Sequence, residues 1–341
     1  MKAVALTRYL PIDDPQALFD VELPEPEPGP HDLLVDVEAI SVNPVDTKVR
    51  APKDRTEPQP RVLGWDAAGR VLAVGREVRG FQPGDAVYYA GDLTRPGCNA
   101  QRQCVDARIA ALRPQRLSAA ESAALPLTAL TAYEALFDGL GIDVDGGRDA
   151  GKSLLIIGAA GGVGSIALQL ARLAGLRVIG SVSRDATRAW VASLGLTETV
   201  DHRQPLPPQL AALGVPEVDY ILNCASSDQY WGVCAELLRP RGKACSIVEN
   251  RQALDQSLYK NKSLTHVWEF MFTRSMYRTA DMEQQGRILQ RIAAWIDTGT
   301  LRTTLHDHDQ PICAATLRAA HAELESGRSI GKRVLSGWPG L

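Results

Sequence analysis

Near its middle the chain reads Leu154-Leu155-Ile156-Ile157-Gly158-Ala159-Ala160-Gly161-Gly162-Val163-Gly164-Ser165. The four apolar residues predict a buried strand, the glycines predict a tight turn, and the apolar spacing that follows predicts a helix. Glycines let a backbone approach a pyrophosphate without a Cβ clash, and the amides at the start of the helix point at the anion. This stretch therefore predicts a doubly wound α/β sheet that binds a dinucleotide.

The glycine pattern departs from the common G-x-G-x-x-G at one position. Ala159 stands at the first glycine position, while Gly161 and Gly164 occupy the other two. We expect Gly161, Gly162 and Val163 to contact the pyrophosphate. The motif alone is weak evidence, and close packing of helix on strand without a nucleotide is the alternative.

Residues near the end of the second predicted strand indicate which dinucleotide binds. An acidic residue usually stands there in NAD sites, but this chain has Ser183 followed by Arg184, with Arg188 one helical turn further on. A guanidinium binds a 2′-phosphate through forked, charge-assisted bonds. The sequence therefore favours NADPH. In the alternative, Arg184 pairs with Asp185 at a helix start, and the preference stays open.

The pattern of apolar runs and turn residues divides the chain into two parts. Up to about residue 125, short β-like runs alternate with turn residues, including the proline-rich loop 24–30. From Leu154 onward, apolar runs alternate with helical stretches, which is the rhythm of a parallel sheet with right-handed crossovers. Two helices are predicted at about 283–298 and 311–326, followed by a short strand at 332–335.

Composition excludes several classes of protein. The net charge is −3, so no bulk cationic surface draws the chain to nucleic acid or acidic membranes. The six cysteines form no C-x-x-C pair, which is typical of a reducing compartment. The first ten residues make a poor signal peptide, and no run reads as a transmembrane helix. We expect a cytoplasmic protein.

Beyond these local features, the sequence resembles the medium-chain dehydrogenase/reductase superfamily. It is similar to the zinc-free quinone oxidoreductase, or zeta-crystallin-like, branch, and most of all to the zinc-type alcohol dehydrogenase-like subgroup. The matching stretches are the glycine turn and residues 41–48, 63–69, 124–132 and 268–276. The resemblance implies a GroES-like β-rich catalytic domain at 1–126 and 272–341 and a Rossmann NADPH-binding domain at 127–271. It also implies a homodimer.

Zinc members of this superfamily offer a check on the metal. Catalytic zinc needs three protein ligands and an open position. The usual first cysteine position carries Asn43, the usual Gly-His-Glu carries Gly64-Trp65-Asp66, and the third ligand position falls near Leu127. One carboxylate does not hold Zn²⁺. We therefore expect no metal, despite the subgroup's name.

Without zinc, reduction of an electron-poor acceptor is easier than oxidation of an alcohol. The hydride lands on a conjugated carbon, and charge spreads onto the carbonyl oxygen. We expect an NADPH-dependent oxidoreductase that reduces quinones or α,β-unsaturated carbonyls. The alternatives are a zinc-type alcohol dehydrogenase and, from another class, a catalytically idle NADPH-binding redox sensor or crystallin-like protein.

The site residues follow from the positions that the resemblance matches. Asn43 is the expected donor to the substrate carbonyl, with a turn before Pro44 as its alternative role. Lys48 stands where several relatives carry a tyrosine suspected of guiding protons, and a surface lysine is its alternative. Thr131 is expected near the nicotinamide carboxamide or the phosphates, or else bonds its own helix backbone, and His202 is expected on the adenosine side of the pocket, with a surface histidine as the alternative. Ligands sit at the carboxyl ends of parallel strands, so the loops around Asn223, Ile247 and Phe270 should approach the cofactor through backbone groups.

Overall fold

The computed structural model describes residues 1–340, which divide into two compact units. The β-rich unit comprises Met1–Leu127 and the described residues from Phe272 onward, and the parallel-sheet unit comprises Thr128–Met271. The sequence predicts changes of domain at 126/127 and 271/272. No helix in the described residues is both long and apolar enough to cross a membrane.

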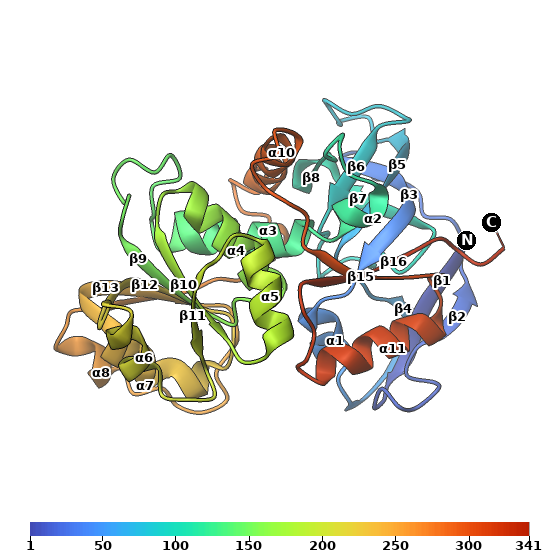
Figure 1. Cartoon of the computed structure of the whole chain (residues 1–341). Helices are drawn as coiled ribbons and strands as arrows, with labels where there is room; N and C mark the ends of the chain where they lie inside the picture. The colour runs from blue at the N-terminus through green and yellow to red at the C-terminus, as the bar shows by residue number, and fades with distance from the viewer. Residues whose placement is uncertain (341) are drawn as a thin grey trace. The chain divides into compact units, whose positions relative to one another are not determined.

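The parallel-sheet unit is built on six strands in the order β11-β10-β9-β12-β13-β14, with every neighbouring pair parallel (Figure 1). The order reverses between β9 and β12, as in a doubly wound sheet. The predicted α/β class with a Rossmann sheet is therefore confirmed. Its strands are β9 (Ser153–Ile157), β10 (Arg177–Val182), β11 (Glu198–Asp201), β12 (Val218–Asn223), β13 (Leu238–Ser246) and β14 (Thr265–Trp268).

Helices connect these strands and cover them. All five residues of β9 are buried, as expected for a strand covered on both faces. Leu155 and Ile157 join a core with the apolar sides of the flanking helices. The helical elements are α3 (Pro126–Tyr133), the π-helix η2 (Glu134–Gly139), α4 (Gly162–Leu173), α5 (Asp185–Ser193), α6 (Leu206–Ala212), α7 (Ser227–Leu237) and α8 (Ser257–Lys260).

The β-rich unit contains two sheets. One has the order β2-β1-β4, and the other has the order β15-β16-β3-β5-β6-β8, with β7 also paired to β3. Their strands are β1 (Lys2–Tyr9), β2 (Phe19–Glu22), β3 (Asp32–Ser41), β4 (Lys53–Val62), β5 (Ala67–Val74), β6 (Ala86–Tyr89), β7 (Arg102–Asp106), β8 (Ala110–Leu112), β15 (Leu305–Asp309) and β16 (Lys332–Ser336).

Helices of the β-rich unit include the two predicted near the end of the chain. These are α10 (Gln284–Asp297) and α11 (Ala314–Glu325), and α11 starts three residues later than predicted because Cys313 is extended. Ser118 and Glu121 form the expected capping box of α2. The other helices are α1 (Pro44–Arg50), α2 (Ala119–Ala123), α9 (Thr273–Met276) and the 3₁₀ turn η1 (Ala107–Ile109).

Candidate functional site

The glycine turn joins β9 to α4 as the sequence predicts, and two of its glycines are required by geometry. Gly158 has a φ of +84°, a conformation that L side chains rarely adopt. A Cβ on Gly164 would lie 2.4 Å from the Gly158 carbonyl oxygen and 2.7 Å from the Cα of Ala159. The helix therefore packs on the turn only where residue 164 has no side chain.

The start of α4 offers backbone donors to an anion. The first turn of a helix leaves its N–H groups without intrahelical partners, and here that turn contains Gly162, Val163 and Gly164. A Cβ at Gly161 would meet only the Gly158 carbonyl oxygen, at an ordinary 3.5 Å. Packing therefore does not require glycine at 161, whereas close approach of a phosphate to the turn does.

The carboxyl end of β10 carries the residues predicted to choose between NADPH and NADH. Ser183 and Arg184 are half-buried, and no acidic side chain occupies position 183. The Arg184 amide donates to Thr187 Oγ1 at 3.0 Å, which fixes the backbone at the start of α5. Arg188 is exposed, and its Nη1 donates to Thr199 Oγ1 at 3.0 Å. The Arg188 guanidinium therefore lies beside β11, at Thr199.

His202 lies next to the glycine turn. It follows β11, which pairs with β10 so that Val182 lies opposite Asp201. Its Nδ1 is 3.3 Å from Ser181 Oγ, and that hydroxyl accepts a hydrogen bond from the Gly158 amide at 3.0 Å. Partial burial lowers the pKa of His202, with a smaller contribution from the nearby arginines. A neutral imidazole thus borders the turn.

The other predicted cofactor residues occupy different environments. Asn223 ends β12 and is buried, and its carbonyl accepts from the Ile247 amide at 3.3 Å, just beyond β13. Carboxyl ends of parallel strands meet at one sheet edge, so this pair shares an edge with the glycine turn. Phe270 follows β14 and is half exposed, and Thr131 is buried on α3.

Asn43 belongs to a buried polar cluster in the β-rich unit, which we call the Lys332 cluster: Asn43, Asp46, Asp66 and Lys332. The Asn43 amide nitrogen donates to Asp66 Oδ2 at 2.8 Å, and its Oδ1 accepts from Lys332 Nζ. Its backbone N–H donates to Asp46 Oδ2 at the start of α1. The side chain is fully buried, so its polar groups are already bonded within the protein.

Lys332 was not predicted as a site residue, yet its ammonium holds the cluster together. Its Nζ donates to the Val42 carbonyl at 2.9 Å, to Asp66 Oδ2 at 3.0 Å and to Asn43 Oδ1. An ammonium has three hydrogens, and all three have acceptors. Lys332 is 3% exposed. The sequence does not indicate that Lys332 is buried here, because lysines are rarely fully buried.

Of the positions compared with zinc ligands, 43, 66 and 127 converge on this cluster, and 65 does not. The Leu127 amide donates to Asp66 Oδ1 at 2.7 Å, so positions 43, 66 and 127 lie together. Trp65 points elsewhere, because its indole N–H donates to the Asp92 carbonyl at 3.1 Å and its ring packs edge-on against Phe272. A lysine ammonium, an amide and two carboxyls that already bond within the protein do not make a zinc donor set. Within residues 1–340, no three His, Cys, Asp or Glu side chains gather as metal ligands.

Burial sets the protonation of the two carboxyls in the cluster. It raises the pKa of Asp46 to about 7, although the Asn43 amide and Lys332 favour its charged form. Burial also raises the pKa of Asp66, against the opposing effects of Lys332 and Asn43. Asp46 Oδ1 is buried without a hydrogen-bond partner in the described residues. Lys48, on the same helix, is exposed instead.

Two family models match parts of the chain. Residues 29–122 match the alcohol dehydrogenase GroES-like domain, and residues 194–335 match a model described as zinc-binding dehydrogenase.

Curated relatives align over most of the chain. A zinc-type alcohol dehydrogenase-like protein of Staphylococcus epidermidis is 38% identical over 98% of this chain and 99% of its own length. The quinone oxidoreductase QR1 of Triphysaria versicolor is 34% identical over 67% of this chain and 70% of its own. Among solved structures, a Rhizobium etli protein described as a zinc-dependent alcohol dehydrogenase is 46% identical, with a TM-score of 0.94 over 100% of this chain and 99% of its own.

Proposed function

The chain belongs to the medium-chain dehydrogenase/reductase superfamily, and we propose that within it the protein is a zinc-independent, NADPH-dependent oxidoreductase. Its proposed substrates are quinones or α,β-unsaturated carbonyls, reduced by hydride transfer.

A single observation carries the zinc-independent part of this proposal. Lys332 Nζ lies between Asn43 Oδ1 and Asp66 Oδ2, at the place where the superfamily's ligand positions meet. A divalent cation beside that ammonium would be repelled, and Asn43, Trp65 and Leu127 offer it no thiolate or imidazole. The Rhizobium etli protein is described as zinc-dependent, and this description is not carried over to the present chain.

The residues present fit a nicotinamide dinucleotide. A side chain at Gly161 would meet only one atom closely, and the amides of Gly162 and Val163, in the first turn of α4, would donate to a phosphate there. Arg184 and Ser183 support a preference for NADPH, because the 2′-phosphate brings close to two negative charges. When bound, the nicotinamide supplies the hydride.

The proposed substrate class follows from the missing metal. An alcohol needs a group that takes its proton and stabilises the alkoxide, and zinc does this in metal-containing relatives. A quinone or enone already spreads the incoming charge onto its carbonyl oxygen. The quinone oxidoreductase name of the Triphysaria relative points to the same class.

Asn43 and Lys48 stay the predicted catalytic residues. The side-chain amide of Asn43 already donates to Asp66, so a substrate carbonyl has to compete with Asp66 for the Asn43 amide hydrogens. Lys48 is exposed on α1 and can reach solvent protons. The predicted homodimer and cytoplasmic location are part of the same proposal. Strand β14, which pairs on one side only within the described residues, supports the dimer.

The test is a screen of NADPH oxidation over quinones, enones and aldehydes, run with and without a strong chelator. We expect turnover with quinones or enones that the chelator leaves unchanged. Stoichiometric zinc that is lost together with activity would establish a zinc alcohol dehydrogenase instead. Tight NADPH binding without turnover of any acceptor would favour the idle binding protein.

A further inference from the structure

The end of β10 packs closely against the glycine turn, and it does so through Gly180. A Cβ on Gly180 would lie 2.7 Å from the Cβ of Ala159 and 2.5 Å from a methyl carbon of Leu196. Ala159, which stands at the first glycine position of the motif, is fully buried. Its methyl group therefore occupies the space that Gly180 leaves open, and the next residue of β10 is brought to the backbone of the turn.

That next residue, Ser181, bonds the turn twice. Its carbonyl oxygen accepts from the Ala159 amide at 3.2 Å, and its hydroxyl oxygen accepts from the Gly158 amide at 3.0 Å. Ser181 is 1% exposed. A buried amide that loses its acceptor costs more than an exposed one. The Ser181 hydroxyl therefore helps to hold Gly158 in the left-handed conformation from which the turn begins.

The same hydroxyl reaches His202. Ser181 Oγ lies 3.3 Å from His202 Nδ1, and within residues 1–340 this nitrogen is the only acceptor within hydrogen-bond distance of the hydroxyl. Burial lowers the pKa of His202, and the positive charges of Arg203 and Arg184 act in the same direction, against the charge of Asp201. A neutral imidazole accepts at one nitrogen and carries its proton on the other. Nδ1 therefore accepts from Ser181, and Nε2 carries the proton.

A chain of donors thus runs from the Gly158 amide through the Ser181 hydroxyl to His202 Nδ1. The Nε2–H group at its end has no partner in the part of the chain that the structure describes, and the side chain is only half-buried. The adenosine side of a dinucleotide, where the family resemblance places His202, offers hydroxyl oxygens and ring nitrogens as acceptors.

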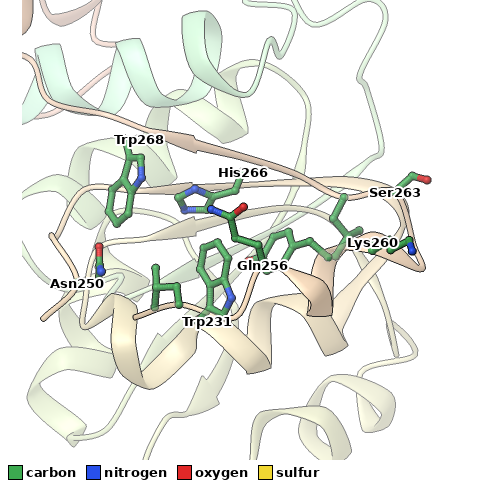
Figure 2. A pocket seen from close by; sticks show the side chains of 10 residues that line it. Trp231, Asn250, Gln256, Lys260, Ser263, His266 and Trp268 are labelled. Carbon is green, nitrogen blue, oxygen red and sulfur yellow. The ribbon is translucent and has the colours of Figure 1, made fainter. Parts of the chain in front are cut away.

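The parallel sheet holds a second serine–histidine pair that does not touch the turn. Ser246 Oγ lies 3.1 Å from His266 Nε2, and His266 lines a surface pocket beside β14 with Trp231 and Trp268 (Figure 2). That edge of the sheet is the surface at which we propose the dimer. In the described residues the Ser246 hydroxyl bonds to no amide of the glycine turn. Of the two pairs, Ser181 and His202 alone link an imidazole to the turn.

We propose that Ser181 is a positioning residue for the dinucleotide, and that it couples the glycine turn to His202. Its hydroxyl holds the start of the turn, so that the first amides of α4 meet the pyrophosphate. It also keeps the proton of His202 on Nε2, as a donor to the adenosine side. This inference rests on the proposed dinucleotide site, but not on the choice between NADPH and NADH or on the reduced substrate.

The first experiment measures the dissociation constants of NADPH and NADH by fluorescence titration of the full-length protein. We expect Ser181→Ala to weaken both dinucleotides about three- to tenfold, as for the loss of one hydrogen bond. Both should be affected because they share the pyrophosphate and the adenosine, whereas Arg184→Ala should act on NADPH alone.

Ser153→Ala is the matched control. Ser153 Oγ also accepts a buried backbone amide, from Asp219 at 3.0 Å, but it lies at the start of β9, at the end of that strand opposite to the glycine turn. The variant should lower the Tm and leave both dissociation constants unchanged.

The second experiment reads the tautomer of His202 by ¹⁵N NMR of the cofactor-free protein, with the signal identified by its loss in His202→Phe. We expect the Nε2–H tautomer in wild type and a mixture of tautomers in Ser181→Ala. His202→Phe should also weaken both dinucleotides, and by a smaller factor when Ser181→Ala is already present, because the two residues act through one chain of hydrogen bonds.

Each outcome decides a separate point. Unchanged affinities in Ser181→Ala, or equal losses in Ser181→Ala and Ser153→Ala, overturn the positioning role. An Nδ1–H tautomer in wild type overturns the coupling to His202. Wild type that binds neither dinucleotide overturns the proposed function and this inference with it, whereas wild-type binding that Ser181→Ala does not weaken contradicts this inference alone. Should circular dichroism show that Ser181→Ala does not fold, the wild-type tautomer and the affinities of His202→Phe decide.

Discussion

Lys332 is buried with three acceptors, so removing its charge leaves Asp66 without its cation. We expect Lys332→Met to lower the free energy of unfolding by about 3–5 kcal/mol, the usual loss when one partner of a buried ion pair is removed. Adding Asp66→Asn should recover part of the loss, because no charge is then left buried. Urea unfolding measures both variants.

The matched control is Lys262→Met, whose ammonium also has three acceptors, Glu217 and the carbonyls of Glu236 and Leu238, but whose side chain is 29% exposed. It should cost about 1 kcal/mol or less. Equal losses at positions 332 and 262 would contradict the role assigned to the buried ammonium.

Asp46 makes stability depend on pH in a direction opposite to that of most carboxylates. Burial raises its pKa in the folded protein to about 7, against 3.8 for an ordinary aspartate. The folded state therefore holds a proton that the unfolded state has lost between these values, and stability from this group falls as pH rises from about 4 to 7. Asp66, whose pKa is also raised, adds to the same trend.

Asp46→Asn keeps an oxygen that accepts from the Asn43 backbone N–H, and it removes the carboxyl group that titrates. Relative to wild type, the variant should therefore be more stable at pH 8 than at pH 5. Thermal unfolding across this range measures the difference in Tm. A constant difference between variant and wild type would mean that Asp46 does not titrate there.

Arg184 is predicted to select NADPH. A charge-assisted bond is worth roughly 1.5–3 kcal/mol, so Arg184→Ala should weaken NADPH binding roughly 10- to 150-fold. NADH binding should hardly change, because it brings only a hydroxyl to this end of β10. Fluorescence titration gives both dissociation constants.

Arg177→Ala serves as the control for this measurement. Arg177 begins β10, at the end of the strand opposite to Arg184, and pairs with Glu198. Equal weakening of both cofactors by Arg184→Ala would mean that the residue supports the fold or the shared pyrophosphate. Tighter binding of NADH than of NADPH to wild type would overturn the cofactor preference.

In the β9–turn–α4 element, packing requires glycine at position 164, and phosphate binding requires it at position 161. Substitutions at the two positions therefore test the two requirements separately. A methyl group at Gly164 collides with backbone atoms, so Gly164→Ala should lower both stability and NADPH affinity. A methyl group at Gly161 makes only ordinary contact, so Gly161→Ala should keep the wild-type Tm and lose affinity. Thermal unfolding and titration of the two variants measure the contrast. A loss of stability in Gly161→Ala would show that packing of the turn also requires glycine at position 161.

Strand β4 shows where element prediction failed. Its sequence, Lys53 to Val62, carries charges and two prolines and has no apolar alternation. It forms because it lies at the edge of its sheet and pairs only with β1. An edge strand needs hydrogen bonds on one side only, so prolines are tolerated there. The π-helix η2 was also not predicted, because apolar spacing does not distinguish it from a continued α-helix.

The whole molecule is predicted to be a homodimer of this 36.9 kDa chain. Strand β14 ends the parallel sheet with no further strand beside it in the described residues. The apolar Trp268 and Phe270, at its end and just beyond, are half exposed. An uncovered edge of this kind pairs readily with another chain. Light scattering over a range of concentrations should give about twice the chain mass, and a monomer at every concentration would refute the dimer.

The sequence by itself determined the alternating strands and helices of the Rossmann sheet and its glycine turn. Each of these is local: a strand, a turn and a helix follow one another within about twenty residues, and the backbone there requires particular residue types. Pattern and position were therefore sufficient to predict them. The same locality made the capping box at Ser118 and helix α10 predictable.

Only the tertiary structure decided what surrounds Asn43. Lys332 reaches it because β16 pairs with β3, placing Val334 opposite Ser41 across almost the whole length of the chain. No periodicity in the sequence reports such a pairing, and a lysine read alone suggests a solvated surface. The tertiary structure also gathered Trp231, His266 and Trp268 around one pocket. Long-range pairing, which depends on the packing of entire sheets, set both environments.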